Sequence, residues 1–438
     1  MASTDPRSLS LRQLKAVLLV GEVGSVTRAS SALARSQSAT TKAVTQVERN
    51  LGVSLFDRTG SGMLPTAHGR ILLRRLRSVA REFELARSAH RSMAGNPDRD
   101  SNLPLFRMDI SNSRLDALVA LYECRDAKRA ADSLGVTAQS IYRSLHELQE
   151  QLGIALYQRT TAGILEATPF CRTLMTHVKL AYAEIGHAIA ELESIGGAPR
   201  GRVRIGTLPP TKTIIPQAIN RVLSNHPQIQ LSVRDGDFPG LESALRSGDL
   251  DMVVGTRHVQ SDYPDVMFLP LMDAPFFVFA REGHPLADVE TVTPAQLSKC
   301  QWITPPAHTP QRKWLDSFLD GEGQTLPADS IDCTTFEVIS AVVASSDRLG
   351  LAPLLDLERS DQRTPVVLLP VPELIDPDPE TVPSTLHVMI RAHTTLSPAA
   401  KAFYRSLTRV AREIEARLTR GVSLARFSPA RILSMDRR

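Results

Sequence analysis

A nine-residue motif occurs twice in this chain with small changes, and this repetition limits the possible folds more than any other feature. "LGVSLFDRT" begins at Leu51, and "LGIALYQRT" begins at Leu152. An offset of 101 residues aligns 9–65 with 110–166 without a gap and matches apolar positions across three helix-sized segments. Similarity of this kind indicates one small domain present in two copies.

The first copy has the pattern of a helix-turn-helix followed by a wing. Three apolar stripes recur at helical spacing: Leu11, Leu14, Val17 and Leu18, then Ala29, Ala32 and Leu33, then Val44, Val47 and Leu51. Ser25 and Ser36 precede the second and third helices and are expected to cap them. "LFDRTGSGMLPT" then predicts two short extended pieces around a Gly-Ser-Gly tip.

The polar face of the third helix is the expected DNA-reading surface, because the second helix of this motif enters the major groove. Glutamine can pair with an adenine edge, and hydroxyl and ammonium groups can contact bases or phosphates. The candidates are Ser36, Gln37, Ser38, Thr40, Thr41 and Lys42, with Arg58 of the wing aimed at the DNA backbone. A helical bundle with a solvated polar face is the alternative interpretation of the same spacing.

The second copy differs in charge. Residues 9–66 carry seven basic and three acidic side chains, whereas residues 109–168 carry six basic and eight acidic ones. Phosphate neutralisation dominates DNA affinity, so the first copy is the better expected DNA binder. The corresponding candidates in the second copy are Gln139, Tyr142, Arg143 and Arg159. This copy either reads a second, weaker DNA element or serves as a spacer and dimerisation module.

The first 66 residues resemble the winged helix-turn-helix of LysR-type transcriptional regulators. The resemblance rests on "LRQLKAVLLVGEVGSVTRASSALARSQSATTKAVTQVERNLGVSLFDRTGSGMLPTAHG", in which Thr40-Thr41-Lys42 departs from the family's usual residues. The family implies a long dimerising helix after each copy and a homodimer or homotetramer. Leu72, Leu76, Val79, Phe83 and Ala86 provide one helical seam, and Leu174, Val178, Ala181, Ile185, Ala188 and Leu192 provide the other.

Alternating strands and helices follow from Arg202, which argues for parallel sheets with ligands at the carboxyl ends of the strands. "IGTL", "SGDLDMVVG", "GHPL" and "GLAP" resemble the LysR effector domain, which has the two-lobed type II periplasmic-binding-protein fold. "GTLPPTKTIIPQ" and "WITPPAHTPQR" look most like the branch of galactose-binding-protein and protocatechuate-pathway regulators.

The expected fold is therefore multi-domain, with two mainly α winged helix-turn-helix domains before an α/β two-lobed effector domain. The predicted ranges are a DNA-binding domain at 8–66, a linker helix at 67–94, a second winged domain at 109–168, a second linker helix at 169–195, an effector domain at 202–420 and a basic tail at 421–438. Lobe I is expected at about 202–262 and 376–420, and lobe II at about 263–375.

Strand ends and helix starts line the cleft of such a fold, where free N–H groups favour an anionic or polyhydroxylated ligand. Hydroxyls can hydrogen-bond a carboxylate or a sugar, an arginine can clamp a carboxylate, and an aromatic ring can pack on the ligand. The candidates are Thr207, Thr211, Arg257, Thr304, Thr335 and Phe336. A threonine at a strand end also commonly caps a helix, which is the alternative role for each.

Composition and motifs narrow the function class. No apolar run approaches a membrane span and no secretory signal is seen, so we expect a cytoplasmic, nucleoid-associated protein. The four scattered cysteines suggest no zinc site and no disulfides, and we expect neither metal nor cofactor. The eleven histidines form no HExxH and GxSxG is missing, which argues against an enzyme. The leading hypothesis is a ligand-responsive regulator that binds double-stranded DNA, and the alternative is a small-molecule-binding assembly protein.

Overall fold

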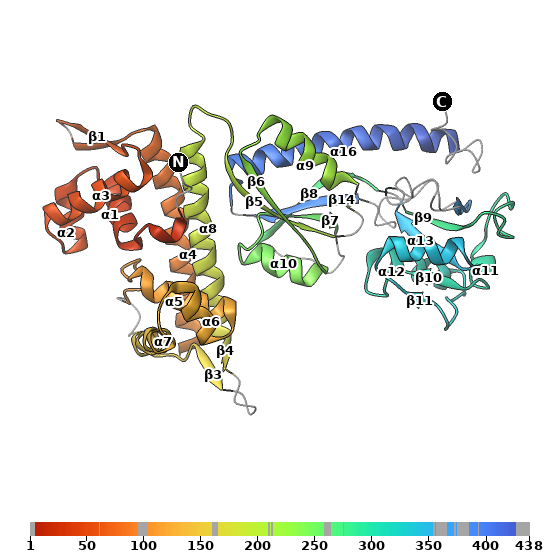
Figure 1. Cartoon of the computed structure of the whole chain (residues 1–438), viewed down its shortest axis with the longest axis horizontal. Helices are drawn as coiled ribbons and strands as arrows, with labels where there is room; N and C mark the ends of the chain where they lie inside the picture. Colours follow the sequence, from red (N-terminus) through yellow and green to blue (C-terminus); the bar gives the residue numbers. More distant parts are fainter. Residues whose placement is uncertain are drawn as a thin grey trace. The chain divides into compact units, whose positions relative to one another are not determined.

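The computed structural model describes residues 5–60, 62–94, 103–159, 165–208, 211, 213–257, 264–274, 276–353, 355, 366–371, 374, 385–392 and 394–425. The chain divides into two compact units (Figure 1), one made mainly of residues 1–201 and the other mainly of residues 202–438. Within the described residues, no helix combines the length and apolarity needed to cross a bilayer.

The first unit contains two modules with the same order of elements. The first module (residues 5–94) comprises η1 (Pro6–Ser8), α1 (Leu11–Val23), α2 (Val26–Leu33), α3 (Gln37–Leu51), β1 (Phe56–Thr59), β2 (Gly62–Pro65) and α4 (Ala67–Ala94). The second module (residues 103–193) comprises α5 (Asn112–Cys124), α6 (Ala127–Leu134), α7 (Ala138–Leu152), β3 (Tyr157–Arg159), β4 (Leu165–Ala167) and α8 (Pro169–Glu193).

Short polar side chains start the helices of both modules. Ser25 and Ser36 cap α2 and α3 as predicted, because each side-chain oxygen accepts a backbone N–H of the first turn. Asp126 and Thr137 cap α6 and α7 in the same way, 101 residues later. The helix boundaries of the two modules therefore follow one set of local signals.

The alignment without a gap is wrong from the tip of the wing onward. Thr66 donates its backbone N–H to Leu55, and Thr168 donates to Leu156 in the corresponding bond. Leu55 and Leu156 are 101 residues apart, whereas Thr66 and Thr168 are 102 apart. The second wing therefore has one residue more than the first.

One predicted core position of α2 is also wrong. Ala32 is exposed, whereas Ala29 and Ser30 are buried. The Ser30 hydroxyl donates to the carbonyl of Val26 at 2.7 Å, so its polar group is satisfied within the helix. Burial of this serine therefore leaves no unpaired hydroxyl.

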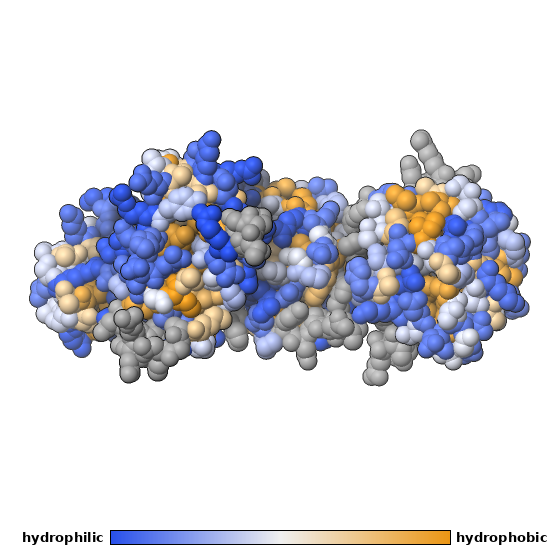
Figure 2. All heavy atoms as spheres, turned by 90° about the horizontal axis from the view of Figure 1, so that it is seen from below, coloured by the Kyte–Doolittle hydropathy of each residue, from blue (hydrophilic) through white to orange (hydrophobic). Residues whose placement is uncertain are grey.

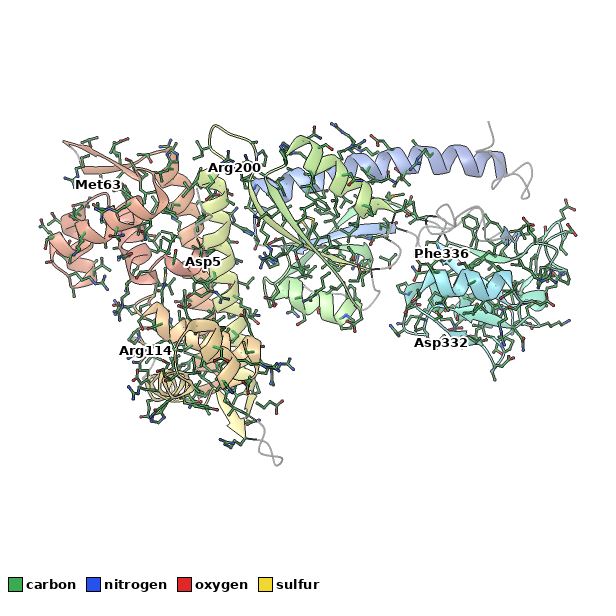
Figure 3. All side chains as sticks on the ribbon, in the orientation of Figure 1. Asp5, Met63, Arg114, Arg200, Asp332 and Phe336 are labelled. Carbon is green, nitrogen blue, oxygen red and sulfur yellow. The ribbon has the colours of Figure 1, made fainter. Side chains whose placement is uncertain are left out.

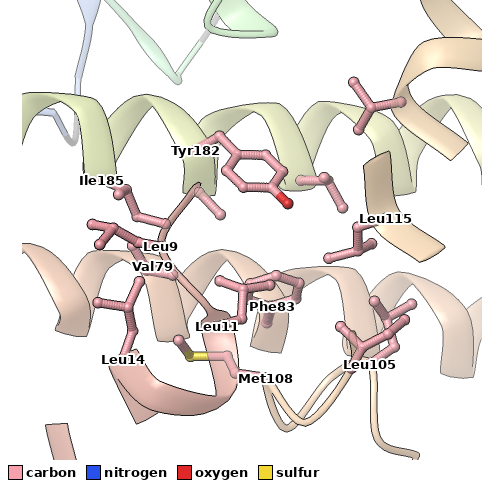
Figure 4. Close-up of a cluster of buried hydrophobic side chains, with 14 of the residues drawn as sticks. Leu9, Leu11, Leu14, Val79, Phe83, Leu105, Met108, Leu115, Tyr182 and Ile185 are labelled. Atoms are coloured by element: carbon pink, nitrogen blue, oxygen red, sulfur yellow. The ribbon is translucent and has the colours of Figure 1, made fainter. Parts of the chain in front are cut away.

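The long helices α4 and α8 lie side by side (Figure 1) and their predicted seams face a common core (Figure 4). Every seam position is buried, namely Leu72, Leu76, Val79, Phe83 and Ala86 on α4 and Leu174, Val178, Ala181, Ile185, Ala188 and Leu192 on α8. The same core continues into α1, α5 and the three-helix bundles of both modules. The first unit is therefore built around this helix pair.

The second unit contains two five-stranded sheets. The first has the order β6-β5-β7-β14-β8, from β6 (Ile229–Asp235), β5 (Gly201–Thr207), β7 (Met252–Thr256), β14 (Thr385–Arg391) and β8 (Val266–Asp273). The second has the order β11-β10-β12-β9-β13, from β11 (Ile331–Asp332), β10 (Trp302–Thr304), β12 (Leu349–Pro353), β9 (Phe276–Arg281) and β13 (Val366–Leu368). The helices are α9 (Ile214–Asn225), α10 (Phe238–Arg246), α11 (Pro294–Leu297), α12 (Pro310–Gly321), α13 (Phe336–Ala344) and α16 (Pro398–Ala425).

The α/β class of this unit agrees with the prediction, but three details differ. Both sheets are mixed, because β14 pairs antiparallel with β7 and β8, and β9 pairs antiparallel with β12 and β13. Since β8 belongs to the first sheet, the lobe boundary predicted near residue 263 lies about ten residues too early. Helix α16 continues to Ala425, so the predicted tail begins inside a helix, and residues 426–438 lie outside the described residues.

Candidate nucleic-acid interface and effector site

The start of α3 presents a polar surface to solvent. The Ser36 hydroxyl accepts the N–H of Ala39 at 3.2 Å and lies 3.0 Å from the Ser38 hydroxyl. Ser36, Gln37, Ser38 and Lys42 are exposed, and Thr41 is half-buried. Five of the six predicted helix positions can therefore meet a ligand, and the positive end of the helix favours phosphate there.

Thr40 is the exception, and its prediction as a DNA contact is wrong. Its side chain is fully buried, and its hydroxyl donates to the carbonyl of Ser36 at 3.2 Å. Thr40 lies one helical turn before Val44, so it shares the core-facing side of α3. The equivalent residue of the second module, Ile141, is also buried.

Two exposed residues were missing from the predicted set. Thr45 and Arg49 continue the exposed side of α3 beyond Lys42. Thr41, Thr45 and Arg49 are each four residues apart, which places them on one side of the helix. This spacing was available in the sequence and extends the candidate surface along α3.

The first wing is held against the helices by backbone contacts. The N–H of Met63 on β2 donates to the carbonyl of Gly24 at 2.9 Å. Gly62 has φ +130°, and a Cβ atom there would lie 2.4 Å from the same Gly24 carbonyl oxygen. Arg58 is exposed on β1, in a wing whose position is fixed by this close approach.

The second module repeats the geometry with different chemistry. Gln139, Tyr142 and Arg143 are exposed on α7, and Tyr142 has 48% of its surface accessible. Arg159 is exposed on β3. Glu150 stands 101 residues after Arg49, so the side of α7 that corresponds to the α3 surface carries an acid where α3 carries a base.

Two predicted effector contacts in the first sheet already have partners. Thr207 ends β5, and its hydroxyl donates to the Asp235 carboxylate. Thr211 is 2% exposed, and its hydroxyl donates to the carbonyl of Leu208 at 2.9 Å. The Thr211 hydroxyl therefore closes a turn with Leu208, which differs from the alternative role of a helix cap, because Thr213 is the N-cap of α9.

Arg257 follows β7, is exposed, and stacks on an aromatic side chain. Its guanidinium carbon lies 5.0 Å from the ring centroid of Phe268, which also has the His387 ring at 6.2 Å. Burial lowers the pKa of His387, and the charge of Arg257 contributes in the same direction. Arg257 is therefore the accessible cation beside a neutral imidazole.

The second sheet brings Thr304 into a polar network. Thr304 is fully buried, and its hydroxyl accepts a hydrogen bond from Arg312 at 2.8 Å. Arg312 also bonds Asp316 at 2.9 Å and Asp332 at 3.0 Å. Arg312 was not among the predicted contacts, although it is the last residue of the quoted "WITPPAHTPQR" and lies in the first turn of α12.

Thr335 and Phe336 begin α13, and Figure 3 labels Phe336 and Asp332 in this part of the second unit. Thr335 is exposed, and the half-buried Phe336 ring lies 6.2 Å from that of Phe279. Within the described ranges, no hydrogen bond joins these residues or Thr304 to Thr207, Thr211 or Arg257. The described part of the chain also holds no cluster of three or more metal-ligating side chains.

Comparison with known proteins identifies two kinds of family domain. Residues 11–70 and 113–172 match the "Bacterial regulatory helix-turn-helix protein, lysR family", and residues 196–412 match the "LysR substrate binding domain". The transcriptional regulator GalR of Pseudomonas putida is 31% identical over 78% of this chain and 83% of its own length. The regulator GbpR of Azospirillum brasilense is 26% identical over 53% of this chain and 68% of its own length.

A solved structure has a similar fold over part of the chain. A full-length OxyR variant from Pseudomonas aeruginosa matches with a TM-score of 0.52 at 18% identity, over 68% of this chain and 97% of that one. The relatives are transcriptional regulators, which confirms the prediction of a regulator and not an enzyme. The chain belongs to the LysR family of bacterial transcriptional regulators.

Proposed function

We propose that the first module is a winged helix-turn-helix that binds promoter DNA, and that the second module is a second copy of it. The supporting observation is the capped, exposed start of α3, where Gln37 and Lys42 meet solvent in a module of net positive charge. Orphan N–H groups at a helix start bind phosphate, and a nearby glutamine can read a base edge. We assign DNA binding to residues 8–66.

Gel-shift titration on the DNA upstream of the protein's own gene tests this assignment at fixed, moderate salt. Gln37→Ala and Lys42→Ala are expected to weaken sequence-preferring binding, because both side chains are exposed on α3. Thr40→Val is the matched control on the same helix, because Thr40 is buried. Binding that is unchanged by the first two variants, or independent of salt, favours a module used for assembly alone.

We further propose that residues 202–420 sense a small polar or anionic metabolite, a sugar or an organic or aromatic acid, and that this binding controls the arrangement of subunits. Arg257 supports an anionic ligand, because it is an exposed cation held over Phe268. Arg312, hydrogen-bonded to the buried Thr304, places a guanidinium near the end of a parallel strand, where α/β sheets bind ligands.

A thermal-shift screen of sugars and carboxylic acids tests the effector proposal. A ligand that binds only the folded state raises the unfolding temperature in a concentration-dependent way. Arg257→Ala is expected to abolish the shift produced by an acid, whereas Lys299→Ala, an exposed cation at the end of α11, should retain it. An acid that stabilises both variants equally would exclude Arg257 from the site.

A further inference from the structure

We propose that α4 and α8 pair within one chain in the way that two equivalent helices pair across the interface of a symmetric dimer. A single chain then forms a complete head, by which we mean the two modules of residues 5–94 and 103–193. The surface of α4 then has its partner in the same polypeptide and needs no second copy. The DNA-binding role of this head rests on the function proposed above, whereas the pairing itself does not.

The apolar seams of α4 and α8 are equivalent to each other. Residues 102 positions apart are buried to the same extent in the two helices. At most 2% of the surface is exposed in each member of three such pairs, namely Leu76 and Val178, Val79 and Ala181, and Phe83 and Ile185. Figure 4 shows Val79, Phe83 and Ile185 in one cluster with Tyr182. Each helix therefore uses the same face toward the other.

The two helices also make a pair of reciprocal side-chain contacts. Arg75 on α4 bonds Glu184 on α8 at 2.8 Å, and His177 on α8 bonds Glu82 on α4 at 2.9 Å. Arg75 and His177 are 102 residues apart, and so are Glu82 and Glu184. When residue i contacts j and j contacts i, the interface is isologous, as in a two-fold dimer.

Two equivalent positions of the modules also contact each other. The N–H of Leu11 donates to the Asn112 side chain at 3.3 Å, and these residues are 101 apart. In a two-fold arrangement, residues that contact their own equivalents lie near the axis. The Asn112 amide also donates to the carbonyls of Arg7 at 2.8 Å and Leu9 at 2.9 Å, which joins the two modules there.

Differences between the modules favour the mixed pair over two identical helices. Glu191 on α8 is buried and bonds both Arg74 and Arg75, while its equivalent on α4 is Ala89. In a pair of two α8 helices, Glu191 would face Thr176 and His177, the equivalents of Arg74 and Arg75. In a pair of two α4 helices, the two arginines would face Ala89. A buried carboxylate without a matched cation is costly, so the charges select α4 with α8.

The chain connection favours pairing within one chain. His90, near the end of α4, has its ring 5.3 Å from that of Phe106, only 16 residues later. The His90 Nε2 atom also lies 2.8 Å from the carbonyl oxygen of Leu152, and its ring lies 5.3 Å from that of Phe170. Closing so short a connection costs little entropy compared with recruiting a second chain.

Cross-linking of the full chain tests the proposal. On a background with Cys124, Cys300 and Cys333 changed to serine, Glu82→Cys and His177→Cys place two thiols on facing helices, at side chains that are each 18% exposed. A short bis-maleimide is expected to join residues 82 and 177 in a product that runs at single-chain mass on a denaturing gel. Peptide mass spectrometry identifies the joined residues.

Co-expression of the two single-cysteine chains is the matched control. Pairing within one chain predicts no product of double mass from this mixture. A double-mass product joining 82 of one chain to 177 of another would overturn the proposal, and so would the lack of any 82–177 link in the folded double variant. If that variant fails to fold, Arg7→Cys with Glu123→Cys repeats the test at an exposed ion pair between the modules.

The readout is independent of DNA. A cross-link within one chain combined with no DNA binding would refute the function proposed for the first module and leave the pairing intact. A cross-link between chains combined with normal DNA binding would do the reverse.

Discussion

At the scale of single residues, Arg75 is a buried cation through which α4 pairs with two acidic residues of α8. Its side chain is 3% exposed and faces the buried carboxylates of Glu184 and Glu191. Removing one partner of a buried ion pair typically costs about 3–5 kcal/mol, because the other charge stays buried. Arg75→Met should therefore accelerate hydrogen exchange of α8 amides by about two to four orders of magnitude, since local stability sets the exchange rate.

Arg74→Met is the control for this prediction. Arg74 bonds the same Glu191, but its side chain is 58% exposed, and an exposed ion pair contributes about 1 kcal/mol at most. Exchange in α8 should then change by less than about tenfold. Equal effects of the two variants would show that burial of Arg75 does not govern the stability of the pair.

The buried carboxylate of Glu184 predicts acid sensitivity. Burial alone would raise the pKa of Glu184, but hydrogen bonds and charges from His187 and Arg75 outweigh it and lower this pKa below 4.5. A lowered folded-state pKa gives stability that is present above the unfolded value and is lost as pH falls through the folded value. The unfolding temperature should therefore decrease when the pH is lowered below about 4.5. The decrease should be smaller in Glu184→Gln, which lacks the titrating carboxylate.

Thr40 marks the limit of reading single residues from the sequence. Cap residues Ser25 and Ser36 were predictable, because each signal is local to one helix turn. Thr40 was misassigned, because a polar side chain can be buried when its hydroxyl bonds its own helix. The repeat itself contained the correction, since the equivalent residue is the apolar Ile141.

At the scale of elements, the first wing depends on one glycine. Gly62 has φ +130° and approaches the Gly24 carbonyl, so Gly62→Ala adds both backbone strain and a clash. A residue held in such a conformation costs about 1–3 kcal/mol, and the wing must move to relieve it. We expect a lower unfolding temperature and weaker DNA binding, measured by calorimetry and gel shift.

Gly60→Ala is the matched control in the same wing, because a Cβ atom at Gly60 meets nothing within 4 Å. It should leave both the unfolding temperature and DNA affinity close to those of the parent chain. If Gly62→Ala behaves in the same way, the contact with Gly24 does not position the wing.

Elements formed by local signals were predicted better than pairings between distant strands. The helix order of both modules follows from caps and apolar spacing, and β5, α9, β6, α10 and β7 follow from alternating patterns. The antiparallel insertion of β14 beside β7 joins residues at least 130 positions apart in the sequence. Nothing in the local pattern of either strand specifies that partner, so the mixed sheets and the place of β8 were missed.

At the scale of the whole molecule, hydrophilic and hydrophobic residues are mixed over the surface seen in Figure 2, so hydropathy alone does not distinguish the DNA-binding side. Charge does distinguish the modules. The first has four more basic than acidic side chains over residues 9–66, and the second has two more acidic than basic over residues 109–168. A head built from both should therefore hold DNA asymmetrically.

Lys42→Ala and Arg143→Ala test this asymmetry, because they remove one exposed cation from equivalent positions of α3 and α7. Each phosphate contact contributes about 0.9 to the slope of log K against log salt. Lys42→Ala should reduce that slope by about 0.9, whereas Arg143→Ala should reduce it by clearly less, since neighbouring acids such as Glu147 and Glu150 repel phosphate. Gel-shift titrations at several salt concentrations measure both slopes. Equal reductions would mean that the second module contacts the backbone as fully as the first, despite its net negative charge.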